Sequence, residues 1–264
     1  MPAPPRTRAV PAAFLVLAGI GVLAVGLPIV ALLARAPWSR AGDVLTAPGS
    51  RTAFALSFEV AAIAAAVDLL IGVPLAFALA RVRFPGRTVA RGLVVLPLVM
   101  PPVVAGVALL AAFGRRGLVG AWLDRTLGVQ ITFTTWAAVI ATAFVSLPLV
   151  VLAVEAGLRS ADRRLEEAAA SMGGSRWYVL RRVTLPLLAP QIVAGAVLAW
   201  ARALGEFGAT LMFAGNLPGR TQTLPLEVFQ VAQTDPQGAT VLAIAMVGMS
   251  LAVIVALRRR FLSP

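Results

Sequence analysis

The sequence contains no cysteine, no histidine and no lysine. Without cysteine it has no disulfides, thiolate metal sites or cysteine nucleophiles, and without histidine it has no imidazole base. A phosphate-binding loop that ends in Gly-Lys-Ser/Thr needs a lysine, so the chain is not expected to hydrolyse nucleotides itself. No catalytic residue and no metal site are therefore expected.

Charged residues are also scarce, at 13% of the 264 residues, against about 25% in soluble domains. Hydrophobic residues make up 59%, and the mean hydropathy is +0.90. A membrane span needs about 20 apolar residues. The sequence thus predicts an all-α polytopic membrane protein, a single domain over 1–264 with six transmembrane helices. The predicted spans are 10–34, 54–80, 92–113, 133–154, 187–212 and 239–257.

The first span has an alternative, because Arg6 and Arg8 precede it as they would precede a signal peptide. A signal core has about 7–15 apolar residues, which is shorter than this run, so a retained span is favoured. With the N-terminus inside, 15 of the 23 arginines fall in cytoplasmic segments and 7 outside. This bias predicts cytoplasmic N- and C-termini and explains the net charge of +12 without nucleic-acid binding.

The largest cytoplasmic loop, residues 159–185, has the pattern of two short helices. Its apolar stripe at i, i+3, i+4 and i+7 consists of Leu165, Ala168, Ala169 and Met172. Residues 163, 164, 166 and 167 lie off the stripe and are expected to face water. Gly173 and Gly174 end the first helix, and Ser175 can cap a second one through Trp177 and Tyr178. The narrow ridge favours docking into another protein over lying on lipid headgroups.

This loop resembles the EAA loop of ABC-importer permeases, whose pattern is E-A-A, three residues, G, nine residues and I-x-L-P. The matching positions are Glu167, Ala168, Ala169, Gly173, Val183, Leu185 and Pro186. The one departure is valine for isoleucine at position 183. The resemblance implies a type I ABC-importer permease fold, in which the loop docks on a separate ATP-binding subunit.

Charged residues also occur inside predicted spans. Arg202 and Glu206 are spaced i, i+4 in span five, and Asp68 stands alone in span two. Such residues either fix helix packing or line a path through the membrane. Packing is slightly favoured for Glu206, and the two roles are equally favoured for Arg202. The candidate residues of a translocation path are Arg202, Glu206, Asp68, Thr210, Pro101 and Pro102.

The segment 204–230 resembles molybdate and sulfate permeases and is closer to the molybdate type. The resemblance implies a homodimer in the bacterial inner membrane, two ATP-binding subunits that hold ATP and Mg²⁺, and an external oxyanion-binding protein. It implies no cofactor in this chain. Tungstate is not separated from molybdate. The alternatives are a sulfate or thiosulfate permease, a gradient-driven secondary transporter and, far behind, a membrane-embedded enzyme.

Two further patterns concern organisation. Residues 96–113 and 185–202 share nine of eighteen residues at an offset of 89, which indicates either a parallel repeat or chance in similar compositions. Residues 117–127 and 224–233 are predicted to form short external helices, which either dock a binding protein or anchor the chain at the membrane surface.

Overall fold

The computed structural model describes residues 11–261, and these residues form helices and connecting loops without a β-strand. Arg6 and Arg8 lie outside the described residues. The first elements in chain order are α1 (Ala12–Ala34), η1 (Trp38–Arg40), α2 (Ala41–Thr46), α3 (Pro48–Arg81), α4 (Arg87–Val99), α5 (Pro102–Phe113), α6 (Gly120–Leu127) and α7 (Thr135–Ser160). They are followed by α8 (Arg163–Ser171), α9 (Arg176–Val179), the π-helical turn η2 (Leu180–Thr184), α10 (Leu185–Leu204), α11 (Gly208–Ala214), α12 (Leu224–Ala232) and α13 (Pro236–Phe261).

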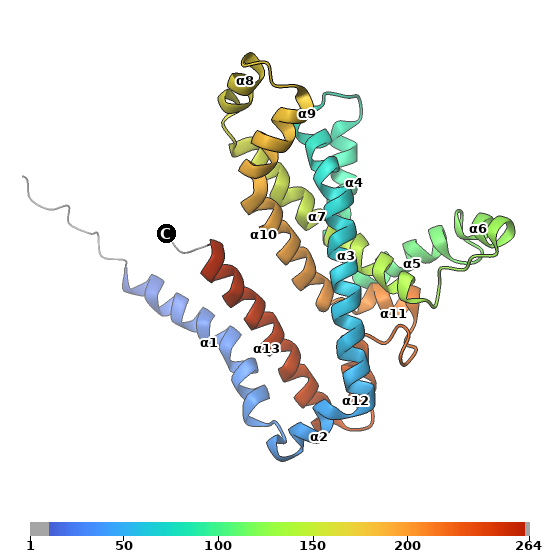
Figure 1. Cartoon of the computed structure of the whole chain (residues 1–264). Helices are drawn as coiled ribbons and strands as arrows, with labels where there is room; N and C mark the ends of the chain where they lie inside the picture. Colours follow the sequence, from blue (N-terminus) through green and yellow to red (C-terminus); the bar gives the residue numbers. More distant parts are fainter. Residues whose placement is uncertain (1–10, 262–264) are drawn as a thin grey trace, which may run out of the picture.

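The centre of the molecule is a bundle of α3, α7 and α10 (Figure 1). Small residues let these helices approach closely, as is usual in membranes. A Cβ atom on Gly195 of α10 would lie 3.2 Å from the Val150 Cα of α7, and one on Gly72 of α3 would lie 3.1 Å from a Val150 side-chain carbon. Val150 is therefore enclosed between two glycines on neighbouring helices.

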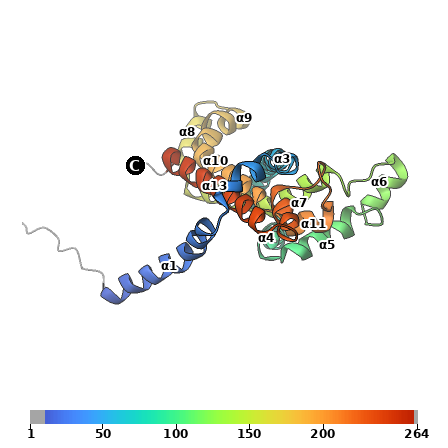
Figure 2. The same ribbon diagram turned by 90° about the horizontal axis from the view of Figure 1, so that it is seen from below.

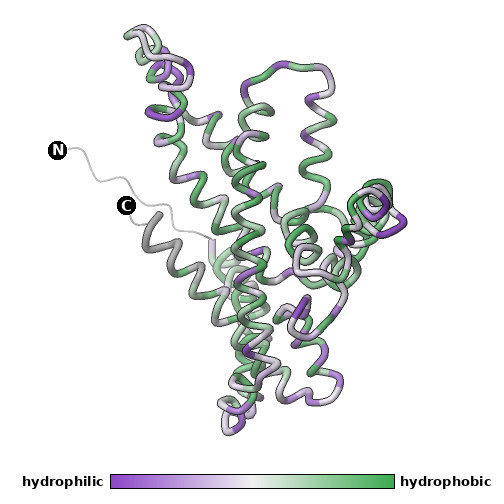
Figure 3. The backbone as a smooth tube through the Cα atoms, turned by 45° about the vertical axis from the view of Figure 1, so that its right-hand side comes forward, coloured by the Kyte–Doolittle hydropathy of each residue, from purple (hydrophilic) through white to green (hydrophobic). Residues whose placement is uncertain are grey.

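The first helix, α1, stands apart from this bundle beside α13, as Figures 1 and 2 show. None of its residues is buried, although it is strongly apolar. Along the chain, hydrophilic segments gather in the loops and short helices at the ends of the long helices (Figure 3). Such a distribution suits a chain whose long helices are surrounded by lipid.

Four described helical runs are long and apolar enough to cross a membrane: α1, α3, α7 and the continuous run Arg176–Leu204. The two shorter apolar helices are Pro102–Phe113 and Pro236–Ala252. The all-helical prediction is confirmed. The number of six spans and the cytoplasmic location of both termini stay predictions.

Two predicted spans are each interrupted, which corrects the prediction of continuous helices. Span three, predicted at 92–113, divides into α4 and α5 at Met100 and Pro101. Span five, predicted at 187–212, ends as α10 at Leu204 and resumes as α11 at Gly208. Proline explains the first break, because its ring and missing N–H disfavour a helix interior.

The helix boundaries do not follow the sequence repeat. At an offset of 89, the break at residues 100–101 corresponds to residues 189–190, which lie inside the continuous α10. Pro190 sits in the first turns of α10 and does not interrupt it. The two segments therefore differ in where their helices break, and the parallel repeat stays a prediction.

The two short helices that follow the breaks, α5 and α11, pack against each other. Gly106 of α5 makes this contact possible, because a Cβ atom there would lie 2.5 Å from the Met212 Cβ and 3.0 Å from the Ala209 carbonyl oxygen. Phe213 and Leu109 add buried apolar surface to the same region. The α5–α11 contact thus depends on a missing side chain.

We expect Gly106→Ala to destabilise the subunit by about 1–3 kcal/mol, the usual cost of forcing a methyl group into a packed contact. Thermal unfolding of the purified protein in detergent measures the effect. Gly92→Ala in α4 is the matched control, because a Cβ atom at Gly92 meets nothing within 4 Å. Equal melting temperatures for the two variants would contradict the close α5–α11 packing.

Candidate functional site

The short helix α8 projects at one end of the molecule (Figure 1), where α3 also ends. Its N-terminus is capped by Asp162, whose side chain accepts a hydrogen bond from the Arg164 N–H at 2.9 Å. The predicted stripe exists: Leu165 is 50% exposed and Met172 is 83% exposed, while Ala169 is buried. Leu165, Met172 and the exposed Ala168 form an apolar ridge on the surface of α8.

The turn after α8 is a Schellman motif built on the two predicted glycines. Gly173 has a φ of +88°, and its N–H donates to the Ala170 carbonyl, while the Gly174 N–H donates to the Ala169 carbonyl. A Cβ atom on Gly174 would lie 2.7 Å from the Ala169 oxygen. The pair of glycines is therefore needed for two different reasons, a left-handed backbone at Gly173 and close approach at Gly174.

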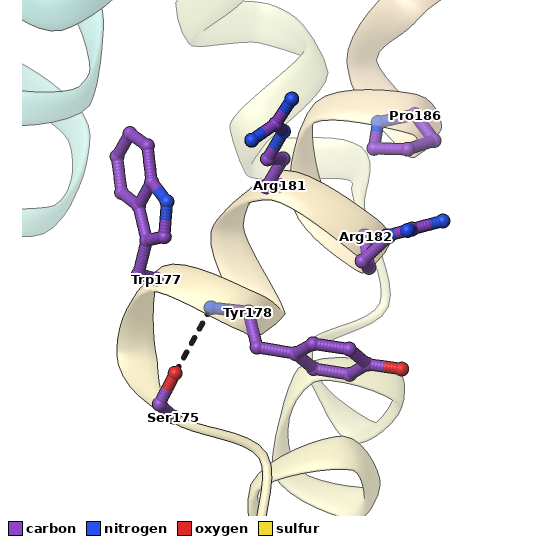
Figure 4. A pocket seen from close by; sticks show the side chains of 6 residues that line it. All are labelled: Ser175, Trp177, Tyr178, Arg181, Arg182 and Pro186. Atoms are coloured by element: carbon purple, nitrogen blue, oxygen red, sulfur yellow. Dashed lines mark hydrogen bonds between the residues drawn. The ribbon is translucent and has the colours of Figure 1, made fainter.

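The second helix of the loop, α9, begins as the sequence predicts. The Ser175 hydroxyl oxygen accepts a hydrogen bond from the Tyr178 N–H at 3.2 Å, drawn as the dashed line in Figure 4. Trp177 and Tyr178 are both exposed. Arg181 and Arg182 follow in η2 and, with Pro186 at the start of α10, line an open hollow of about 750 Å³ (Figure 4).

The charged pair predicted in span five is present, but Glu206 lies in the break between α10 and α11 rather than inside a helix. An Arg202 Nη atom lies 2.7 Å from one Glu206 carboxylate oxygen, and the other oxygen accepts a hydrogen bond from the Ala209 N–H at 2.9 Å. Glu206 is buried, and the Arg202 side chain is 35% exposed. The Glu206 carboxylate therefore neutralises Arg202 with one oxygen and caps the start of α11 with the other.

The other candidate path residues do not join this pair. Asp68 is buried in α3 and forms a hydrogen bond with Ser146 of α7, so it is not the partner of Arg202. Thr210 is buried in α11, and its hydroxyl has no hydrogen-bond partner among the described residues. Pro101 and Pro102 are exposed where α5 begins.

Two glutamates at the α8 end of the molecule were not recognised as structural from the sequence. Glu155, buried in α7, pairs with Arg91 of α4 and with Arg159, the latter at 3.0 Å. Glu166, which was expected to face water, instead contacts Arg81 of α3 at 3.1 Å. The contacts with Arg91 and Arg81 join residues far apart in the sequence, so no local pattern indicates them; only the Glu155–Arg159 pair has the local i, i+4 spacing.

The predicted external helices also form, as α6 and α12. Beside α6, hydrogen bonds from Gln130 and Arg115 hold the pKa of the Asp124 carboxyl below its usual range. Beyond α12, Arg40 pairs with Asp235 at 2.7 Å and lowers the pKa of that carboxyl. Both pairs stabilise loop geometry, and the docking role of α6 and α12 stays a prediction.

Known proteins resemble this chain over most of its length. A family model described as "Binding-protein-dependent transport system inner membrane component" matches residues 69–264. The molybdenum transport system permease protein ModB of Mycobacterium tuberculosis is 47% identical, covering 91% of this chain and 90% of that protein. A probable sulfate transport system permease protein, cysT of Nephroselmis olivacea, is 36% identical, covering 88% of this chain and 82% of that protein.

A solved structure gives the same result for the fold. One chain of a bacterial ABC transporter involved in the import of the acidic polysaccharide alginate matches with a TM-score of 0.72 and 16% identity. The match covers 94% of this chain and 93% of that chain. The predicted ABC-importer permease architecture is confirmed.

We expect Gly173→Val to weaken association with the ATP-binding subunit that the EAA resemblance implies. A left-handed backbone costs a residue with a Cβ atom about 1–2 kcal/mol, so the turn after α8 would change shape. Co-purification of the two subunits measures the effect. Gly128→Val imposes similar strain at the end of α6, where φ is +63°, and serves as the control. Normal co-purification of both variants would contradict the role of the turn.

We expect Arg202→Ala to destabilise the subunit by about 3–5 kcal/mol, because it leaves the Glu206 carboxylate buried and unpaired. The double variant Arg202→Ala with Glu206→Gln should recover most of this loss, since the amide oxygen still accepts from Ala209. Unfolding in detergent measures both. Arg51→Ala removes an exposed arginine without an ion pair in the described structure and is the control. A single variant as stable as that control would contradict a packing role for the pair.

Proposed function

The chain belongs to the family of binding-protein-dependent transport system inner membrane components, and from this membership we propose that it is the permease subunit that carries molybdate through the membrane in an ATP-driven importer. It is a multi-pass protein of the bacterial plasma membrane. The observation that carries the substrate assignment is the 47% identity to a molybdenum permease over nearly the whole of both chains.

The second candidate substrate is sulfate, which the 36% identical relative supports more weakly. Both substrates are oxyanions, so a path for either one needs a cation that can meet a passing anion. Arg202 suits this need, because its side chain is 35% exposed and one of its Nη atoms lies 2.7 Å from Glu206. A guanidinium has five N–H donors, so several remain for an anion.

The energy for transport would come from a partner chain. This sequence lacks the lysine of a nucleotide-binding loop, so ATP and Mg²⁺ would bind to separate ATPase subunits. The exposed ridge of Leu165, Ala168 and Met172 suits insertion into a groove of that partner. We propose an assembly of two copies of this chain, two ATPase subunits and an external binding protein that delivers the anion, without a cofactor in this chain.

The path would run beside the two helix breaks. In transporters, interrupted helices expose backbone groups only where protein or a cavity surrounds them. Here the start of α5 packs against the start of α11, where a Cβ atom on Gly208 would lie 2.6 Å from the Pro102 Cβ, two residues after Glu206. Asp68 is enclosed between α3 and α7, which suits a packing role better than a place on the path.

We expect molybdate to stimulate ATP hydrolysis by the complete complex in liposomes, with the binding protein present, more than sulfate does. Hydrolysis is measured with each anion at the same concentration. The same vesicles without binding protein are the control and should show no stimulation. Stimulation by sulfate alone would replace the substrate assignment, and hydrolysis that depends on neither anion nor binding protein would contradict the import function.

A further inference from the structure

Among side-chain hydrogen bonds, one carboxylate oxygen connects helix α8 to α3 and to the turn before α10. Glu166 Oε1 accepts hydrogen bonds from an Arg81 Nη atom at 3.1 Å and from the Thr184 hydroxyl at 3.0 Å. Arg81 is the last residue of α3, and Thr184 directly precedes α10. Across residues 11–261, no other side chain of α8 forms a hydrogen bond or ion pair with another helix.

An open hollow lies beside this contact. It has a volume of about 580 Å³ and lies between α8, α9 and the end of α3. The lining includes Phe77, Arg81, Glu166, Glu167, Val179 and Thr184. Phe77 and Arg81 of α3 lie on one side of this hollow and Glu166 and Glu167 of α8 on another, and the Arg81–Glu166 ion pair connects the two helices at its edge.

The contact of Glu166 with Arg81 and Thr184 is largely shielded from water, which strengthens it. The side chains of Arg81 and Glu166 are 20% and 21% exposed, and Thr184 is 5% exposed. Ion pairs gain strength as water is excluded, whereas fully exposed pairs contribute little. The Thr184 hydroxyl also lies 3.4 Å from the Val179 carbonyl oxygen, a longer distance than that to Glu166. The Glu166 oxygen is therefore its closer acceptor.

We propose that Glu166 is the positioning residue that transmits a displacement of α8 to α3 and α10. The proposal rests on the proposed function, in which a partner ATPase moves α8 by its ridge. A movement of α8 then acts on the ends of two helices of the central bundle at the same time. Glu167, the next residue, is exposed and has no side-chain partner in the described structure, so the two neighbouring glutamates have different roles.

The test uses the complete complex in liposomes and three variants that each remove one part of the link: Glu166→Gln, Arg81→Gln and Thr184→Val. Arg83→Gln is the matched control, because Arg83 is an exposed arginine two residues after Arg81 and forms no ion pair in the described structure. Uptake of molybdate and hydrolysis of ATP are measured in the same vesicles. Subunit association is measured by co-purification.

We expect Glu166→Gln and Arg81→Gln to reduce the molybdate transported per ATP by about fivefold, the factor that loss of one sheltered ion pair allows. Thr184→Val should reduce it less, and Arg83→Gln should leave it unchanged. ATPase co-purification should stay normal, because the ridge is untouched. The reversed pair, Arg81→Glu with Glu166→Arg, should restore the ratio. A wild-type ratio in Glu166→Gln, or a loss of co-purification with an unchanged ratio, would overturn the proposal.

A second measurement does not depend on the substrate. Since the chain has no cysteine, it adds no background thiol, and spin labels at Arg163→Cys in α8 and Val82→Cys after α3 of one copy, in a complex with cysteine-free partners and an unlabelled second copy, report one distance. With the link intact, this distance should be the same in the nucleotide-free and ATP-bound complex, and Glu166→Gln should make it differ between the two states. A distance that changes equally with and without Glu166 would overturn the link. If wild-type vesicles transport no molybdate, the substrate assignment fails and the labels still decide the link.

Discussion

A helix that stops inside a membrane leaves backbone N–H and C=O groups that water cannot reach, and each must find another partner. The break at residues 205–207 meets this constraint with one side chain. Glu206 accepts the Ala209 N–H with one carboxylate oxygen and faces Arg202 with the other. Because the charge that satisfies the backbone is itself neutralised, α11 can leave the direction of α10 and pack against α5. The break at Met100 and Pro101 has fewer N–H donors to satisfy, since α5 begins with Pro102, which has no N–H.

Helix α10 connects the two regions to which we assign function, which are the α8 end of the molecule and the break at residues 205–207. Helix α10 runs without interruption from Leu185, beside the Thr184 contact with Glu166, to Leu204, beside Arg202. A helix of this length spans roughly 30 Å, and it packs closely against α7 at Gly195 and Gly157. Because densely packed elements transmit strain, we expect α10 to move as one body. A displacement at the α8 end is therefore delivered to the break, where the partly exposed arginine lies.

Local features were predictable from the sequence, and long-range ones were not. The cap at Ser175 and the left-handed turn at Gly173 depend on residues within a few positions, and both formed as expected. The break of span five was missed, because Arg202 and Glu206 have the spacing of a pair within one helix. The chain after the break packs against α5, which is distant in the sequence: a Cβ atom on Gly208 would lie 2.6 Å from the Pro102 Cβ. A hydropathy window has no information on such a contact.

The position of Glu166 was also not predictable from the sequence, because it too depends on long-range contacts. Successive residues of an α-helix point about 100° apart, so a pattern can separate an apolar stripe from polar faces but cannot distinguish between two polar faces. The partners of Glu166 are 85 and 18 residues away, and only folding brings them to one of those faces. A helix of nine residues thereby has an outward ridge that a partner can hold and an inward carboxylate attached to two membrane helices. These are the two attachments that a helix needs in order to pass a force from one subunit to another.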